Sequence, residues 1–321
     1  MRHLLPGGAA VLAVGLLPAT VQAHTGDTPL PTDPLGLALA WQFDLPLVAG
    51  LGLATLAFLA AVRVVNRAHP SNRWPVRRTA AFLLAIGALA LALLSAIDAL
   101  SDDLLTVHMI QHLLLVSVAA PLLAASGIGV LALRVANADL RKGVLLPLLH
   151  SRVVSAVTHP VVGGLAFVVV LWGSHFTELY NLALVDEGVH AVEHFMYLGI
   201  AALFWWPLLS PDPLRWRLHP GVKLAALLVQ IPPMSFLAVT VISAGRPLYP
   251  AYLGRPEQFG LDVLTDQQMA GSLMWVVNDF AFLIPAAFLL MQLVRHEEQE
   301  TQRVDARLDR ERREAEARPQ P

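Results

Sequence analysis

The sequence has no cysteine and few charges. Of its 321 residues, 14% are charged and 56% are hydrophobic, whereas an average soluble domain is about 25% charged. The absence of cysteine excludes a disulfide framework, a thiolate metal site and a Cys-His nucleophile. Any soft-metal chemistry would have to use histidine, methionine or carboxylate ligands. The shortage of charge excludes an ordinary soluble protein and indicates a chain embedded in a membrane.

The charges that are present gather at the carboxyl end. Residues 295–321 hold 15 of the 46 charged residues, seven Arg and eight Asp or Glu, which leaves 31 for the first 294 residues. This segment mixes both signs and has almost no apolar residue. It predicts a solvated helix, although a helix that binds a partner would have the same pattern.

The amino end has the pattern of a secretory signal peptide. Arg2 precedes a short apolar stretch, and Val21, Gln22 and Ala23 form a cleavage box. The apolar stretch is shorter than the ~20 residues that a helix needs to cross a bilayer. Cleavage after Ala23 is therefore favoured over an uncleaved anchor. Residues 1–23 would be removed, and residues 24–45 would form an extracytoplasmic segment.

Seven apolar runs follow, each near the length of a helix that crosses a membrane. We place them at residues 46–65, 79–98, 104–125, 153–173, 189–209, 222–243 and 268–294. They predict an all-α integral membrane protein with seven transmembrane helices. Residues 46–294 would form its membrane domain, and residues 295–321 a charged tail.

The basic residues of the loops predict an orientation. Three alternate loops and their edges hold twelve Lys or Arg, whereas the segments between them hold only Arg246 and Arg255. By the positive-inside rule, the first set of loops is cytoplasmic. The mature N-terminus would then face outward, and the charged tail would lie in the cytoplasm.

Five of the twelve histidines fall at one level of this predicted topology. The string HMIQH places His108 and His112 on one face of the third run, and HAVEH places His190 and His194 on one face of the fifth, because residues four apart are neighbours on a helix. His175 ends the fourth run. All five would lie within about two helical turns of the outer membrane surface.

A metal site explains this grouping better than chance does. A charged group at the centre of a span costs about 2.5–3.5 kcal/mol, and ionisable groups in spans usually face the bundle interior or a functional path. Two pairs of histidines at equal depth therefore favour a metal centre, and a structural cluster of hydrogen-bonded histidines is the alternative. Glu193 is placed to orient an imidazole or to bind the ion itself.

Two methionines extend the candidate ligand set. Met109 and Met196 lie near the outer ends of the third and fifth runs, and a thioether is a ligand for a soft ion such as Cu(I). Each methionine taken alone is more simply explained as core filler. The all-histidine, thiol-free arrangement fits copper better and zinc less well.

Two other chemistries compete with a copper site. HAVEH matches H-x-x-E-H, in which two histidines bind zinc and the glutamate acts as general base, so a membrane-embedded zinc-dependent hydrolase is an alternative. A single haem between two helices would use only two of the five histidines. Neither alternative gives a role to all five.

Asp279 stands apart from these motifs. It falls near the middle of the seventh run, where a carboxylate must be protonated or paired within the bundle. Gln230 and His159 are its candidate partners. A structural polar network and an ion path both account for such a residue.

Longer strings resemble a known family. HMIQHLLLVSVAAPLLA (108–124), HFTELYNLALVDEGVHAVEHFMYLGIAALFWWPLLSPDP (175–213), RPLYPAY (246–252) and DQQMAGSLMW (266–275) resemble the polytopic cytochrome c oxidase assembly factor family, CtaG of the caa-oxidase type, from about Trp41 to Val294. The family motifs map onto His108, His112, Trp172, His175, His190, Glu193 and His194. Thr177 and Glu178 stand where the family usually has a proline.

The resemblance implies a multi-pass protein of the bacterial plasma membrane that helps to assemble a haem-copper oxidase. We therefore expect an assembly factor without catalytic turnover that binds copper at the outward-facing histidines and aids its delivery. The expected partners are cytochrome c oxidase subunits, the lipid bilayer and a periplasmic copper donor, and no nucleic acid. A metal-free assembly scaffold is the remaining alternative.

Overall fold

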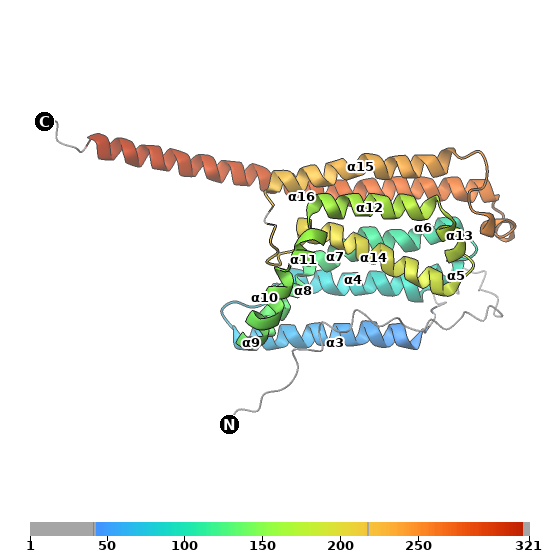
Figure 1. Ribbon diagram of the computed structural model, residues 1–321, viewed down its shortest axis with the longest axis horizontal. Helices are drawn as coiled ribbons and strands as arrows, with labels where there is room; N and C mark the ends of the chain where they lie inside the picture. The colour runs from blue at the N-terminus through green and yellow to red at the C-terminus, as the bar shows by residue number, and fades with distance from the viewer. Residues whose placement is uncertain (1–40, 42, 217, 317–321) are drawn as a thin grey trace, which may run out of the picture.

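The structure is a computed structural model that describes residues 41, 43–216 and 218–316. Within these residues the chain folds into helices, turns and loops and contains no strand, which confirms the all-α prediction. The long helices lie side by side along one direction (Figure 1). The predicted signal peptide, residues 1–23, and nearly all of the predicted segment 24–45 lie outside the described residues.

Six helical stretches among the described residues are long and apolar enough to cross a membrane. Each overlaps a predicted run, although the third and the sixth stretches continue past the predicted ends at 125 and 294, to Val135 and Glu316. They are α3 (Leu45–Ala68), α4 (Val76–Leu94), the continuous stretch of α6 (Leu105–Leu113), η1 (Leu114–Ala119), α7 (Ala120–Ser126) and α8 (Ile128–Val135), then α14 (Glu187–Leu209), α15 (Pro220–Ser243) and α16 (Val263–Glu316).

The fourth predicted run, 153–173, is divided in two. Helix α11 (Arg152–Val157) ends before Thr158, and Pro160 begins α12 (Pro160–His175). Proline suits a first helical position because no N–H is needed there. The 16 residues of α12 span about 24 Å, which is less than the ~30 Å hydrocarbon core. The count of seven transmembrane helices and their orientation therefore stay predictions.

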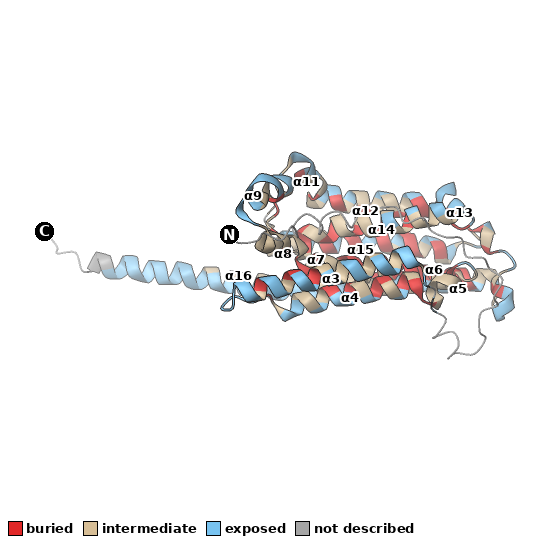
Figure 2. Ribbon diagram, turned by 90° about the horizontal axis from the view of Figure 1, so that it is seen from below, coloured by how far each residue is buried: buried red, intermediate tan, exposed pale blue. Residues whose placement is uncertain are grey.

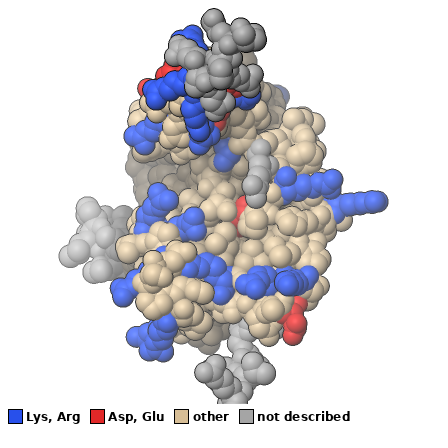
Figure 3. Space-filling view, turned by 90° about the vertical axis from the view of Figure 1, so that its left-hand side faces the viewer, with Lys and Arg blue, Asp and Glu red and all other residues tan. Residues whose placement is uncertain are grey.

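The short helices gather at the two ends of the bundle (Figure 1). One end holds α5 (Ala96–Ser101), α13 (Glu178–Ala183), η3 (Pro250–Tyr252) and η4 (Pro256–Phe259), and the other holds α9 (Ala138–Leu140), η2 (Arg141–Leu145), α10 (Leu146–Leu149) and α11. Lysine and arginine side chains crowd the second end (Figure 3). This end lies opposite α5 and α13 (Figure 1).

The outer surface of the bundle is apolar. Val161, Val229 and Phe288 are 68%, 71% and 59% exposed, and buried residues line the inward faces of the helices (Figure 2). Only 11% of the apolar window of α3 is buried. Large exposed apolar surfaces mark contact with another apolar phase. Together with the six long apolar helices, they indicate a multi-pass membrane protein.

A stretch of π-helix, η1, interrupts the path from α6 to α7. Its backbone follows an i to i−5 pattern, since the N–H of Ala120 donates to the carbonyl of Leu115. Pro121 has no N–H to donate to Ser117, so the regular α-helical ladder cannot continue there. The side-chain hydroxyl of Ser117 donates to Oδ1 of Asn278 at 3.2 Å, and this bond connects η1 to α16.

Helix α16 continues past Arg295 without interruption and projects beyond the bundle (Figure 1). The projecting part is exposed (Figure 2). Arg303 lies 2.6 Å from Glu300, and Arg307 lies 2.8 Å from Glu311. Such exposed pairs contribute about 0.3–0.5 kcal/mol each, so they support the helix only weakly.

Candidate metal centre

Two helix starts place four histidines in matching positions. His108 is the fourth residue of α6, and His190 is the fourth residue of α14. Each therefore lies about 4.5 Å along its helix, and His112 and His194 follow one turn, about 6 Å, further on. Both helices begin at the end of the bundle that carries α5 and α13 (Figure 1).

Carboxylates hold both helix starts. Asp186 precedes α14, and its Oδ1 accepts from the N–H of Val189 at 2.9 Å. The side chain before α6 makes no such bond. Asp266, on α16, supplies it instead: its two oxygens accept from the N–H groups of Leu105 at 2.7 Å and Thr106 at 3.2 Å. A carboxylate at this place satisfies free amides and opposes the helix dipole.

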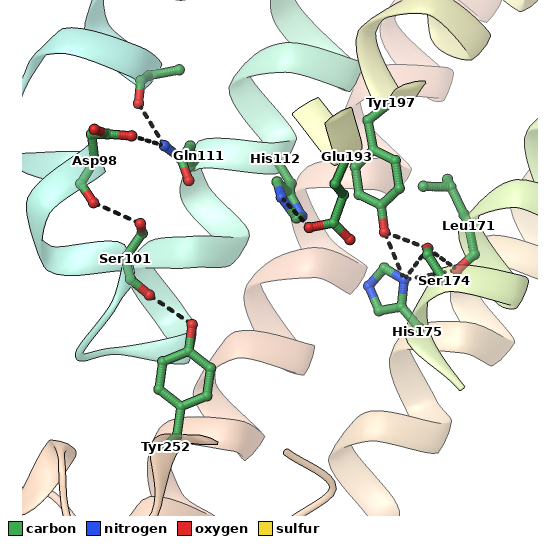
Figure 4. A network of polar contacts seen from close by, with 11 residues as sticks. Asp98, Ser101, Gln111, His112, Leu171, Ser174, His175, Glu193, Tyr197 and Tyr252 are labelled. Carbon is green, nitrogen blue, oxygen red and sulfur yellow. Dashed lines mark hydrogen bonds and ion pairs between the residues drawn. The ribbon is translucent and has the colours of Figure 1, made fainter. Parts of the chain in front are cut away.

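The side chains of α6 and α14 converge inside the bundle. Ligand atoms of His108, His112, His190 and Glu193 all lie within 4.8 Å of one another. The carboxylate of Glu193 is 3.7 Å from Nε2 of His112, and Figure 4 shows the two side chains facing each other. Four ligands at ~2.1 Å around one ion in tetrahedral geometry are about 3.4 Å apart, so a contraction of about 1.5 Å or less would let one ion bind all four. We call these four residues the outer group.

His194 and His175 lie beside the outer group. The ring of His194 is centred 4.1 Å from that of His190 and 5.4 Å from that of His112. Nδ1 of His175 lies 2.8 Å from the carbonyl of Leu171 and 3.3 Å from the hydroxyl of Tyr197 (Figure 4). Since a carbonyl only accepts, Nδ1 carries the proton and Nε2 has its lone pair available, as in histidines that bind metals.

Several of these nitrogens have no hydrogen-bond partner among the described residues. They are both ring nitrogens of His112 and the Nε2 atoms of His175 and His194. His112 and His175 are each 5% exposed. Leaving a buried polar atom unsatisfied costs about 1–3 kcal/mol, and such a group requires an explanation, of which a bound ion is one. Imidazole and carboxylate donors are suitable ligands for copper and zinc.

The structure places the two predicted methionines differently. Met109 is 2% exposed and lines a cavity together with His112 and His175. Met196 is partly buried against the hydrophobic core. Trp172, one turn before His175, donates through Nε1 to the carbonyl of Pro233 at 3.0 Å. This bond joins the end of α12 to α15 beside the histidines.

Sequence reasoning missed Tyr180 and Asp266 as parts of the site. Tyr180, on α13, is fully buried, and its ring is centred 5.3 Å from the rings of both His108 and His175. Its hydroxyl has no hydrogen-bond partner among the described residues. Tyr180 follows His175 by only five residues, but no pattern predicts that the intervening turn folds back over the cluster.

Two tyrosines of the loop between α15 and α16 cover the cluster. Tyr252 donates to the carbonyl of Ser101 at 2.6 Å (Figure 4), and Tyr249 donates to that of His175 at 3.4 Å. Burial raises the pKa of the Tyr252 phenol well above its ordinary value of 10.0. Tyr252 therefore stays a neutral donor and holds the loop on α5.

The predicted partners of Asp279 are wrong. Asp279 accepts from the hydroxyl of Ser235 at 3.1 Å, and Gln230 donates instead to the carbonyl of Gly164 at 3.2 Å. The ring of His159 accepts from the N–H of Val161 at the start of α12. The close packing of α15 on α16 brings Ser235, rather than Gln230, to the level of Asp279.

Comparison with known proteins gives one family and three relatives. Uncharacterised proteins of Mycobacterium bovis and Mycobacterium tuberculosis are 26% identical to the chain over 292 residues, and one of Mycobacterium leprae is 25% identical over 292 residues. These matches cover 88% of the chain but only 43–44% of the relatives, so the chain spans less than half of their length. No solved structure matches.

The family match covers most of the membrane bundle. The family described as cytochrome c oxidase caa3 assembly factor matches residues 56–296, a range that includes every residue of the outer group and agrees with the resemblance seen in the sequence. The chain therefore belongs to the family of cytochrome c oxidase caa3 assembly factors.

Proposed function

We propose that the protein binds copper at the outer group and passes it to a cytochrome c oxidase during assembly. One observation carries this proposal: ligand atoms of His108, His112, His190 and Glu193, from two helices, lie within 4.8 Å of one another in the bundle interior. Copper is the cargo in this account, and no catalytic turnover is required. Oxidase subunits are the proposed partners.

The donor set favours copper over zinc. Three imidazoles and one carboxylate bind either ion, but affinity for divalent metals at such a site rises to a maximum at copper. The carboxylate of Glu193 offsets one positive charge inside a membrane, where an uncompensated charge is costly. Zinc is therefore the second choice.

The proposed site would lie near the outer side of the bacterial plasma membrane. Lysine and arginine crowd the end of the bundle opposite the histidines (Figure 3), and the positive-inside rule assigns that end to the cytoplasm. A periplasmic donor would then meet the end formed by α5, α13 and the loop that carries Tyr252. The charged extension of α16 would lie on the cytoplasmic side.

Metal analysis of the purified protein after loading with copper or zinc tests the proposal. His108→Ala and His190→Ala should each weaken copper binding by more than about 10–100-fold, because that loss is already expected when only a hydrogen-bond partner of a ligand is removed. His219→Ala is the matched control, because His219 is exposed and pairs with His296, at 4.9 Å, away from the cluster. A protein that holds no metal, with both cluster variants still assembling active oxidase, would establish a scaffold instead.

The zinc-hydrolase alternative predicts a different role for Glu193. In H-x-x-E-H enzymes the two histidines of the motif bind the ion and the glutamate is the base. Here Glu193 joins His190 and the two histidines of α6 in one compact group, which favours Glu193 as a ligand. Glu193→Gln should therefore weaken metal binding; a hydrolase would keep its metal and lose its activity.

A further inference from the structure

A cavity lies beside the outer group and shares His112 with it. Four of its lining residues carry soft or borderline donors: Met109, His112, His175 and Met274. Its volume is about 30 Å³. A cavity that holds a single water needs about 10–15 Å³, so a metal ion fits among these side chains.

The packing of α6 against α16 places the two thioethers on neighbouring turns. Leu105 bonds to Asp266, and Ser117 bonds to Asn278; both pairs are separated by 161 residues. The two helices therefore run in parallel with one register from α6 through η1. At that register Met274 lies level with Leu113, one turn or about 6 Å beyond Met109.

The two imidazoles that line the cavity have ring nitrogens available to bind an ion. His175 uses Nδ1 toward Leu171 and Tyr197, and its Nε2 has no hydrogen-bond partner among the described residues. Figure 4 shows this second nitrogen on the opposite side of the ring from those partners. Both nitrogens of His112 likewise have no hydrogen-bond partner there. His112 belongs to the outer group as well, so it stands between the two positions.

The charges of the two positions differ. The outer group contains the carboxylate of Glu193, whereas the described residues that line the cavity include no Asp, Glu, Lys or Arg. A neutral donor set inside a membrane favours a monovalent ion, because each uncompensated charge adds to the cost of desolvation. Thioether ligands also select soft ions, of which Cu(I) is the monovalent example.

We propose that this cavity is a second metal position, specific for Cu(I), in which Met109, Met274 and His175 bind the ion together with His112. The inference rests on the proposed copper-handling function, and it adds an inner site of different charge and ligand softness. The simpler explanation of the two methionines is that they fill the core, and the experiment below distinguishes the two.

The test is an anaerobic Cu(I) titration of the full chain, purified in detergent, together with X-ray absorption at the copper edge. Zn(II) titration reports on the outer group in parallel. The variant is Met109→Leu combined with Met274→Leu, which preserves volume and apolar character. The control is Met269→Leu combined with Met291→Leu, because both residues are exposed, at 46% and 48%, and neither lines the cavity.

We expect sulfur in the first coordination shell of Cu(I) in the wild type and in the control. In the Met109→Leu and Met274→Leu double variant that sulfur signal should vanish and Cu(I) affinity should fall by about tenfold or more, while Zn(II) affinity stays unchanged. Nitrogen-only Cu(I) coordination in the wild type, or an unaltered sulfur signal in the double variant, would overturn the inner site alone. A wild type that binds neither ion would overturn the proposed function as well.

Discussion

Asp266 connects the stability of the bundle to the position of the histidines. It is fully buried, lies on α16, and accepts the N–H groups of Leu105 and Thr106 at the start of α6. His108 follows within one turn. We predict that Asp266→Ala both destabilises the protein and weakens metal binding at the outer group.

The expected magnitude follows from the two bonds. A hydrogen bond to a charged group contributes about 1.5–3 kcal/mol, and loss of a helix cap costs about 0.5–2 kcal/mol. The bond at 3.2 Å is long and counts near the lower limit. We therefore expect a loss of about 2–4 kcal/mol for Asp266→Ala, and roughly half of that for Asp266→Asn, which keeps one acceptor oxygen.

Asp262 offers the matched control. It caps α16 itself, since its Oδ2 accepts from the N–H groups of Leu264 and Thr265 at 3.1 Å. Among the described residues its side chain makes no hydrogen bond to α6. Asp262→Ala should cost about 1 kcal/mol and leave metal affinity unchanged. Thermal unfolding in detergent and metal titration of the same preparations measure both effects. Equal losses of stability and unchanged metal affinity in the two variants would refute the positioning role of Asp266.

Three further substitutions test other parts of the account. Gly271→Ala should lower the unfolding midpoint by the equivalent of about 1–3 kcal/mol, because a Cβ there would lie 2.8 Å from Ile242 Cγ1 and 3.2 Å from the carbonyl of Ala238. In the control, Gly199→Ala, a Cβ meets nothing within 4 Å, so that variant should not destabilise the protein. Equal effects of the two substitutions would contradict the close packing of α15 on α16. Tyr197→Phe removes the hydroxyl that lies 3.3 Å from Nδ1 of His175, and it should reduce the affinity for Cu(I), measured by titration, by up to about tenfold. An unchanged affinity would show that Tyr197 does not orient the imidazole of His175. Burial raises the pKa of Asp212 above its ordinary 3.8, so the folded state binds this proton more tightly than the unfolded state, and the stability contributed by the residue falls as the pH rises through the raised pKa. The stability of Asp212→Asn relative to wild type should therefore increase as the pH rises above 3.8. Thermal midpoints of the two proteins that shift in parallel across that range would contradict this.

The helices that hydropathy located best are those in which apolar composition alone sets the bounds. The predicted run 189–209 matches α14, and 222–243 matches α15, to within two residues at each end. The run 153–173 was less accurate because the local effect of Pro160 divides it into α11 and α12. Hydropathy averages over a window and does not detect a single residue that ends one helix and begins another.

The site was predictable where its members share a helix. Histidines four residues apart lie on one face by geometry, so the pairs of α6 and α14 could be found from spacing alone. Asp266 and Met274 reach the site from α16, and the bonds that set its register join residues 161 apart. Such contacts depend on how helices pack and leave no local periodicity. Tyr180 was missed for the same reason, because its position follows from the fold of α13.

The most direct test of the central claim is electron paramagnetic resonance of the protein loaded with Cu(II). Binding at the outer group predicts one bound ion with hyperfine splitting from three imidazole nitrogens, and loss of one nitrogen or of the ion itself in His108→Ala and in His190→Ala. A spectrum without imidazole coupling, or one that both variants leave unaltered, would contradict a copper site formed by α6 and α14.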